Sequence, residues 1–311
     1  MKIKWFLMTK QKKICLIFLL IVVIFFYYFL IEMKKINNIH ICICTLGKLE
    51  NKYIREYIEH YEKYGVDKIY LYDNNDLNGE KFEEVIIDYI NKGFVEILNW
   101  RGIRKGIHKL MNDCYNRNYR KYDWLIFYEL DEFINLFNYT SIKTFLNEKR
   151  FENCQLLYLN SISHTDNNLL YYDNRSLAER FPKTVPLKKN MKLGVKFIIR
   201  GHINNVKINK VHIGSKRLIN CNSFGHKNKV HGNHAIELDF RNYIDHYYCK
   251  STEEFIFKIN RGDILNNSTT YFMHKVKKYF LQNKITKKKI EMIEKGTGLN
   301  LSIYKKKLDL N

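Results

Sequence analysis

The sequence predicts an α/β protein with a Rossmann-like, mostly parallel sheet, helices on both faces of that sheet, and one transmembrane helix before it. The first observation is a set of short apolar runs with the length of buried strands, at residues 39–45, 68–73, 94–98 and 124–128. The second is a helical pattern of apolar residues between each run and the next. Parallel strands require such crossover connections, so the alternation indicates a parallel sheet covered by helices.

The expected helices between these strands begin near Ile54, Phe82 and Ile107, and Gly65 and Gly93 are the expected ends of the first two. After the fourth strand the pattern is less regular and predicts mixed α and β structure. The elements expected there are helices at 141–149, 252–261 and 285–295 and strands at 154–159, 195–200 and 206–211.

The N-terminal segment contains 18 consecutive uncharged residues at 14–31, which as a helix would cover roughly 27 Å. Five lysines precede it, and only two follow it against one glutamate, so the positive-inside rule places the N-terminus in the cytoplasm. We expect an uncleaved signal anchor in a single-pass type II protein of a Golgi- or ER-type endomembrane, with a lumenal globular part. A cleaved signal peptide is the alternative.

The rest of the chain reads as one globular domain, because it has only two prolines and no Gly/Ser-rich linker. The predicted division is therefore a cytoplasmic tail, the anchor, a short stem, the globular domain and a basic helical extension, at residues 1–13, 14–31, 32–38, 39–265 and 266–311.

The net charge of +21 raises the question of nucleic-acid binding. The densest basic run, residues 275–307, carries no recognisable nucleic-acid motif, so a solvated or membrane-facing surface is the favoured interpretation and no nucleic-acid partner is expected. No disulfide framework can be inferred from the seven cysteines. Cys42 and Cys44 alternate along a buried strand, which favours small core residues, and no Cys-x-x-Cys spacing occurs.

Polar residues follow each of the first four predicted strands, at the sheet edge where ligands bind in open α/β folds. After the second strand, Asp73 could accept a ribose hydroxyl or a base edge. Lys48 and Arg101, after the first and third strands, could bind a phosphate. The residues expected at this edge are Thr45, Lys48, Asp73, Asn75, Arg101, Glu129, Asp131 and Glu132.

Glu129 and Asp131 carry the prediction of a metal site. One residue separates them, so at the end of a strand both carboxylates would project to the same side. Such a pair can hold Mg²⁺ or Mn²⁺ while the remaining positions bind pyrophosphate oxygens and water. The cation would act as a Lewis acid for a departing nucleotide diphosphate. A solvated acidic loop is the structural alternative.

With these residues in view, the chain resembles the family 92-like glycosyltransferases and the related bacterial lipopolysaccharide-type sugar transferases of GT-A fold. Five ordered blocks carry the resemblance, at residues 45–57, 64–75, 124–133, 171–181 and 246–263. The resemblance implies a nucleotide-sugar donor, with UDP-sugars favoured, a divalent cation (Mn²⁺ or Mg²⁺), and an inverting transfer to a hydroxyl of a glycan acceptor.

The resemblance also implies roles for particular residues. Glu129 stands where the family's Asp-x-Asp-like element usually begins with aspartate. A later histidine would complete the metal shell, with His246 preferred over His212. Asp166 and Glu132 are the candidates for the general base that an inverting transfer needs. The residues expected to bind the pyrophosphate are Lys250 and Arg261, with Lys196 and Arg200 as further donors.

Two other hypotheses stay open. The departure at Glu129 motivates a non-catalytic GT-A-like binding or scaffold protein on the membrane. The basic composition motivates a membrane-tethered polybasic protein for anionic lipid or nucleic acid, which would be indifferent to Asp131→Ala.

Overall fold

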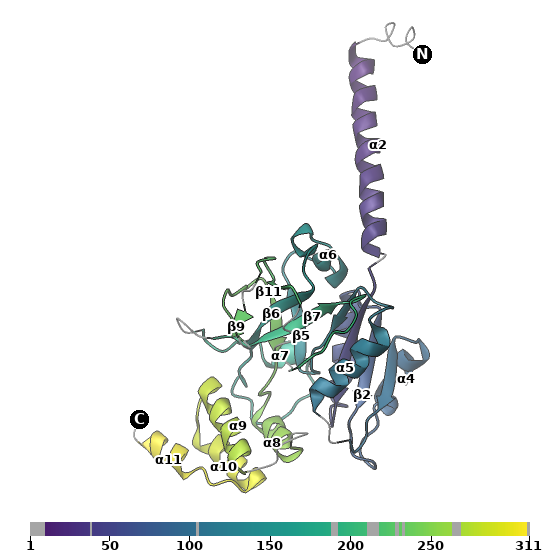
Figure 1. Ribbon diagram of the computed structural model, residues 1–311. Helices are drawn as coiled ribbons and strands as arrows, with labels where there is room; N and C mark the ends of the chain where they lie inside the picture. Colours follow the sequence, from purple (N-terminus) through teal and green to yellow (C-terminus); the bar gives the residue numbers. More distant parts are fainter. Residues whose placement is uncertain are drawn as a thin grey trace.

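The computed structural model describes residues 10–37, 39–103, 106–187, 192–209, 218–227, 230–231, 234–262 and 269–309. In Figure 1 a long helix, α2 (Lys10–Asn37), projects from one end of an α/β body, and the C-terminal helices lie at the opposite end. An 18-residue window within residues 13–34 of this helix has a mean hydropathy of 3.2, and the helix is long and apolar enough to cross a membrane. The helix predicted at 14–31 is thus present, as an anchor or a signal sequence.

The first half of the body is the predicted β-α alternation. The strands are parallel in the order β3-β2-β1-β4, and a helix follows each of the first three. The elements are β1 (Ile41–Gly47), α3 (Ile54–Lys63), β2 (Lys68–Asp73), α4 (Glu83–Asn91), β3 (Val95–Asn99), α5 (Ile107–Asn118) and β4 (Trp124–Ile126).

Both faces of this sheet are covered, as the alternating side chains of β1 demonstrate. Ile41 and Ile43 are fully buried in a core that includes residues of α3 and α4. Cys42 and Cys44 belong to the core on the other face, with residues of α5. Because successive side chains of a strand point to opposite faces, a strand that is apolar throughout is buried on both. The predicted fold class is confirmed.

The second half extends the same sheet with mixed pairing. β7 runs antiparallel to β4 and to β6, β11 pairs in parallel with β6, and β5 closes this edge antiparallel to β11. The strands are β5 (Glu132–Leu136), β6 (Leu156–Ser163), β7 (Val195–Arg200), β8 (Asn220–Asn222) and β11 (Asn242–His246), with a separate β9 (Val230–His231) and β10 (His234–Ala235) pair. Short helical segments lie between them: α6 (Ile142–Leu146), η1 (Lys149–Phe151) and α7 (Leu177–Arg180).

Several of the strand predictions were wrong in detail. The strand expected at 206–211 is absent from its described part, residues 206–209, although Val206 and Ile208 are buried. The side chain of Asn112 instead donates to the carbonyl of Ile208 at 2.7 Å and accepts from its amide at 2.9 Å, so a helix side chain takes the place of a neighbouring strand. The fourth strand ends at Ile126, two residues earlier than expected.

The structure also answers what the cysteine pattern left open. All seven cysteines lie among the described residues, and four form disulfides: Cys44 with Cys114 and Cys154 with Cys221. The first joins β1 to α5, and the second joins the segment before β6 to β8. Cys44 is a small core residue as expected, but its partner is 70 residues away, and no local spacing indicates such a pair.

The C-terminal helices form a third core with α8 (Thr252–Asn260). They are α9 (Thr269–Gln282), α10 (Lys287–Thr297) and α11 (Ser302–Asp309), and their buried residues include Val276, Tyr279 and Ile290. Phe255 of α8 stacks on Tyr279 with ring centroids 4.2 Å apart. The predicted boundary at residue 265 falls in 263–268, outside the described residues.

Candidate functional site

An acidic turn lies between β4 and β5. The amide of Glu132 donates to the carbonyl of Glu129 at 3.0 Å, and the amide of Glu129 donates to the Glu132 carboxylate at 3.0 Å. These bonds curl the chain, so the carboxylates of Glu129, Asp131 and Glu132 gather in a turn and not on an extended strand end. The structure brings together the acidic residues that the sequence grouped, but in a turn and not at the end of an extended strand.

His246 joins this turn from the end of β11, where it is the antiparallel partner of Glu132. One ligand atom from each of these four residues lies within 4.8 Å of the others. The His246 Nε2 atom is buried without a hydrogen-bond partner among the described residues, 3.6 Å from Asp131 and 3.8 Å from Glu132. Two or three carboxylates and one unbonded imidazole nitrogen are a donor set that fits Mn²⁺ or Mg²⁺.

Two lysines neutralise part of this acidic cluster. The Lys196 ammonium, almost fully buried on β7, lies 2.7 Å from Glu132 and 3.4 Å from Glu129. The Lys258 ammonium, on α8, lies 2.8 Å from Asp131 and donates to the carbonyl of Tyr248. Three carboxylates and two ammonium groups leave one negative charge when Glu132 is ionised, so loss of the Glu132 proton would favour binding of a further cation.

Burial and these charges move the pKa values apart. Burial raises the pKa of Glu132 to about 8 even though Lys196 opposes the shift. Burial also acts on Asp131, but the ammonium groups of Lys258 and Lys250 hold its pKa well below the ordinary range. Burial lowers the pKa of His246 to about 3, so its imidazole is neutral at physiological pH, the form that binds metal ions.

A second charged group lies beside the cluster, around the buried Glu50. Arg261, just after α8, donates to Glu50 and to the carbonyl of Lys48, and the Lys250 ammonium lies 3.3 Å from the same carboxylate. The Lys250 ammonium also lies 3.3 Å from the centre of the Tyr53 ring. Two cations on one carboxylate leave this position net positive, which suits a phosphate group.

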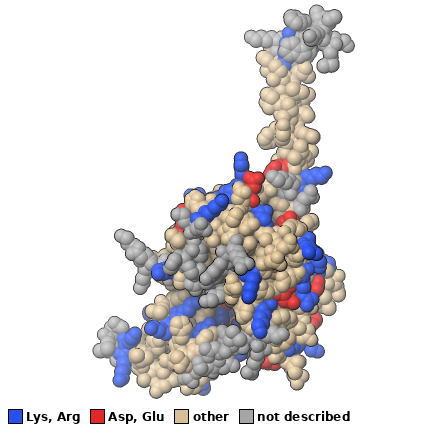
Figure 2. Space-filling model, viewed as in Figure 1, with Lys and Arg blue, Asp and Glu red and all other residues tan. Residues whose placement is uncertain are grey.

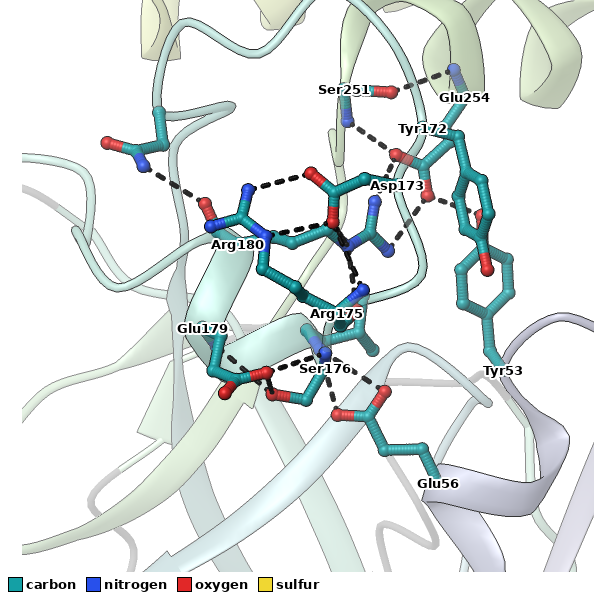
Figure 3. Close-up of polar contacts among 12 residues, drawn as sticks. Tyr53, Glu56, Tyr172, Asp173, Arg175, Ser176, Glu179, Arg180, Ser251 and Glu254 are labelled. Carbon is teal, nitrogen blue, oxygen red and sulfur yellow. Dashed lines mark hydrogen bonds and ion pairs between the residues drawn. The ribbon is translucent and has the colours of Figure 1, made fainter.

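The network in Figure 3 fixes α8, the helix that carries Lys258. Ser251 and Glu254 form a capping box at its first turn, and Glu254 also accepts a hydrogen bond from Tyr53. The buried guanidinium of Arg180 holds Glu254 with two contacts, at 2.7 and 3.2 Å. The start of α8 is therefore tied to α7 and to the residue before α3.

The predicted donor-binding residues of β1 to β3 lie together at the carboxyl edge of the sheet. Asp73 is buried and pairs with Arg101 at 2.6 Å, and Asn75 accepts from the amide of Leu49. Arg101 also donates to three loop carbonyls, of Asp76, Gly79 and Glu80, so much of its hydrogen-bonding capacity serves the loop itself. Thr45 is buried on β1, and Lys48 pairs with the exposed Asp76 at 2.9 Å.

Asp166 does not belong to the acidic cluster. Its carboxylate accepts from Tyr279 at 2.5 Å, pairs with the buried Lys289 at 2.6 Å, and caps its own turn by accepting from the amide of Asn168. These contacts tie it to α9 and α10. His212 lies outside the described residues.

Sequence reasoning did not single out three of the groups described here: Glu50, Glu254 as a partner of Arg180, and Lys258 as a partner of Asp131. A signal existed for Glu50, because it follows β1 at the ligand-binding edge of the sheet. The pairing of Lys258 with Asp131 spans 127 residues and has no local signature.

Comparison with known proteins adds a family match. The family model described as Glycosyltransferase family 92 matches residues 37–295. No curated protein matches the sequence.

Solved structures of Staphylococcus aureus TarS are similar at low identity. TarS 1–349 in complex with UDP-GlcNAc aligns at 12% identity and a TM-score of 0.36, covering 84% of this chain and 80% of that one. The complex with UDP has 12% identity, a TM-score of 0.39 and coverages of 78% and 71%. The longer TarS structure has 10% identity and a TM-score of 0.35, and the match covers 78% of this chain but only 43% of TarS.

Proposed function

The chain belongs to glycosyltransferase family 92, and on this premise we propose that it transfers a sugar from a nucleotide-sugar donor, with UDP-sugars favoured, to a hydroxyl of a glycan acceptor. The observation that supports this most is the cluster of Glu129, Asp131, Glu132 and His246 at the ligand-binding edge of the sheet. Its residue types and the unbonded His246 Nε2 suit a divalent cation, Mn²⁺ or Mg²⁺.

In this proposal Glu129, Asp131 and His246 hold the cation, and Glu132 lies beside them. The longer side chain of Glu129 leaves its carboxylate within ligand distance of the other groups, so its departure from aspartate is compatible with metal binding. When bound, the cation supplies Lewis-acid stabilisation of the charge on a departing diphosphate.

The chain's own cations complete the proposed diphosphate site. Lys250 and Arg261 share Glu50, and Lys258 pairs with Asp131, so all three approach the acidic cluster from α8 and the loop before it. Thr45, Lys48, Asp73, Asn75 and Arg101 are the proposed residues around the nucleoside, from the ends of β1, β2 and β3.

Of the two carboxylates predicted as the general base of an inverting transfer, Glu132 is the better placed. It lies in the cluster, and its pKa of about 8 suits proton transfer near neutral pH. Asp166 stays the second choice, because it lies outside the acidic cluster, where it contacts Tyr279 and Lys289.

For the compartment, we propose a type II orientation with the globular part in the lumen of a Golgi- or ER-type endomembrane. The charge bias around α2 supports the orientation. The two disulfides support an oxidising environment around the body.

The proposal is tested with the full chain in detergent. Mn²⁺-dependent binding of UDP is measured by calorimetry, and release of UDP from a panel of UDP-sugars is measured in the same preparation. Asp131→Asn should weaken Mn²⁺-dependent binding by more than ~100-fold, beyond the loss typical of an outer-shell partner, while the thermal midpoint confirms folding. The matched control is Asp88→Asn on the exposed face of α4, which should behave as the unaltered chain.

One observation favours the scaffold alternative: Lys196 and Lys258 already neutralise part of the acidic cluster. If the unaltered chain binds neither Mn²⁺ nor any UDP-sugar, the cluster is a self-neutralised structural core, and the enzymatic proposal is wrong.

A further inference from the structure

Positive charge is denser in the C-terminal helices than in the body. Residues 269–309 contain eleven lysines against three acidic residues. The body, residues 39–262, contains 35 lysines and arginines against 27 acidic residues. The excess of positive over negative charges is thus eight in both segments, although one has 41 residues and the other 224. The C-terminal helices are therefore more basic per residue than the body.

Part of this charge faces solvent on α9, α10 and the turn between them. Lys277, Lys284, Lys287 and Lys288 are exposed, and we call these four residues the basic face. In the view of Figure 2, Lys and Arg side chains are visible over the C-terminal helices at the lower left, whereas the acidic side chains in view lie on the body.

Helix stability does not explain the basic face. Lys287 and Lys288 occupy the first turn of α10, which carries no acidic residue. The backbone amides of a first helical turn already carry partial positive charge, so lysines there are unfavourable. An anionic partner outside the chain would reverse that cost.

The positive charge continues from these helices to the acidic cluster. The ammonium of Lys278, on α9, lies 3.8 Å from the centre of the Tyr248 ring, and that of Lys258 lies 4.3 Å from it. The Tyr248 ring in turn packs edge-on against His246, with centroids 5.6 Å apart. A molecule bound to the basic face could therefore extend along α9 to the proposed transfer site.

The membrane that α2 would enter is not the partner that this geometry favours. The C-terminal helices lie at the end of the body opposite α2 (Figure 1). If α2 crosses a bilayer, the basic face points away from that bilayer.

We propose that the acceptor is a polyanion, a glycan chain bearing carboxylate or phosphate groups, whose charges bind the basic face while one of its hydroxyls reaches the acidic cluster. This inference rests on the proposed function, because it gives that reaction its acceptor class. Lys277, Lys284, Lys287 and Lys288 act by positioning the acceptor and touch neither the donor nor the cation.

The test uses the full chain in detergent and fluorescently labelled polymers. Polygalacturonate presents carboxylates, polyphosphate presents phosphates, and dextran is the neutral comparison. The variant Lys277→Gln/Lys284→Gln/Lys287→Gln/Lys288→Gln is compared with a control of equal charge, Lys81→Gln/Lys109→Gln/Lys149→Gln/Lys183→Gln, made at exposed lysines of the body. UDP release from a UDP-sugar without acceptor is measured for every variant.

The expected result is salt-sensitive binding of polygalacturonate, polyphosphate or both, no binding of dextran, and a loss of at least about tenfold in affinity for the basic-face variant alone. The polymer that binds more tightly identifies carboxylate or phosphate as the recognised group. UDP release without acceptor should be unchanged in both variants. If the unaltered chain releases no UDP, that result contradicts the proposed function and does not bear on the acceptor class.

Three results would overturn the inference. The first is that neither polymer binds. The second is that the control variant loses as much affinity as the basic-face variant. The third is tighter binding to phosphatidylserine-containing vesicles or to a single-stranded oligonucleotide than to either polymer, which would identify a lipid or nucleic-acid surface.

Discussion

Lys196 determines how stable the acidic cluster is when no metal ion is bound. Its ammonium is almost fully buried between Glu129 and Glu132. An ion pair in the interior is strongly destabilised when one partner is removed, because the other charge stays buried and uncompensated. The same ammonium repels any cation that enters the cluster. Lys196 should therefore stabilise the metal-free chain and weaken metal binding.

We expect Lys196→Met to lower the free energy of unfolding of the metal-free chain by about 3–5 kcal/mol. Mn²⁺ should then raise the thermal midpoint of this variant more than that of the unaltered chain, because a tighter ligand stabilises more by mass action. Thermal unfolding with EDTA or with Mn²⁺ measures both effects. Lys183→Met, at an exposed position, is the control. Equal Mn²⁺-induced shifts in the two chains would contradict this role for Lys196.

Glu132 gives the metal-free chain a specific dependence on pH. Burial raises its pKa from the ordinary 4.5 to about 8, so the folded chain binds this proton more tightly than the unfolded chain. Stability from this carboxyl is therefore complete below about pH 4.5 and is lost as the pH rises to about 8. Glu132→Gln stays neutral, so its stability relative to the unaltered chain should increase between about pH 5 and about pH 8. Thermal unfolding across that range in EDTA measures the difference.

His246 cannot supply this pH dependence. Burial lowers its pKa from the ordinary 6.5 to about 3, so its contribution to stability rises with pH up to about 6.5, opposite in sign to that of Glu132. His246 is also present in both chains, so its contribution cancels when Glu132→Gln is compared with the unaltered chain. A difference between the Glu132→Gln variant and the unaltered chain that stays constant over this range would show that Glu132 has an ordinary pKa.

At the scale of elements, α8 depends on a buried ion pair at its first turn. Arg180→Met would leave Glu254 buried without its guanidinium partner, at a cost of about 3–5 kcal/mol. Because α8 carries Lys258 toward Asp131, the affinity for UDP with Mn²⁺ should fall as well. Arg175→Met is the matched control from the same network, since its pair with Asp173 is exposed and worth about 0–1 kcal/mol. Unfolding midpoints and calorimetry would separate the two. Equal losses in both variants would mean that the buried pair does not fix α8.

The elements also separate what local sequence predicts from what it does not. β1 to β4 and the intervening helices were predicted because each has its own apolar period and stop signal. β5 and β11 were missed: each is five residues long, and the two pair with each other across more than a hundred residues of chain. The same limit applies to the prediction of the acidic cluster. Its three acidic members lie within four consecutive residues and were singled out together, whereas His246 required the family resemblance and the pairing of Lys258 required the fold.

At the scale of the whole molecule, the two disulfides join segments 70 and 67 residues apart. Loops of this length lose roughly 4 kcal/mol of unfolded-state entropy per disulfide in the chain-entropy account. When the chain is denatured without reduction, an alkylating agent should therefore modify three cysteines, Cys15, Cys42 and Cys249. After reduction it should modify all seven. Mass spectrometry counts them. Seven reactive thiols without reduction would place the body in a reducing compartment and contradict the proposed lumenal location.

The stability of the body should depend little on helix α2. Helix α2 is exposed along its apolar length, and Asn147 of the body donates a hydrogen bond to Glu32 at its base at 2.8 Å. Deleting residues 1–37 should therefore shift the thermal midpoint by less than about 4 °C, the effect of ~1 kcal/mol or less in a domain of this size, and should leave binding of UDP with Mn²⁺ intact.

In sealed microsomes, the body of the full chain should resist added protease until detergent is present, because five lysines before the apolar run and two after it favour a cytoplasmic N-terminus. Digestion without detergent would reverse the orientation. Recovery of a chain lacking its first residues would identify a cleaved signal sequence in place of an anchor.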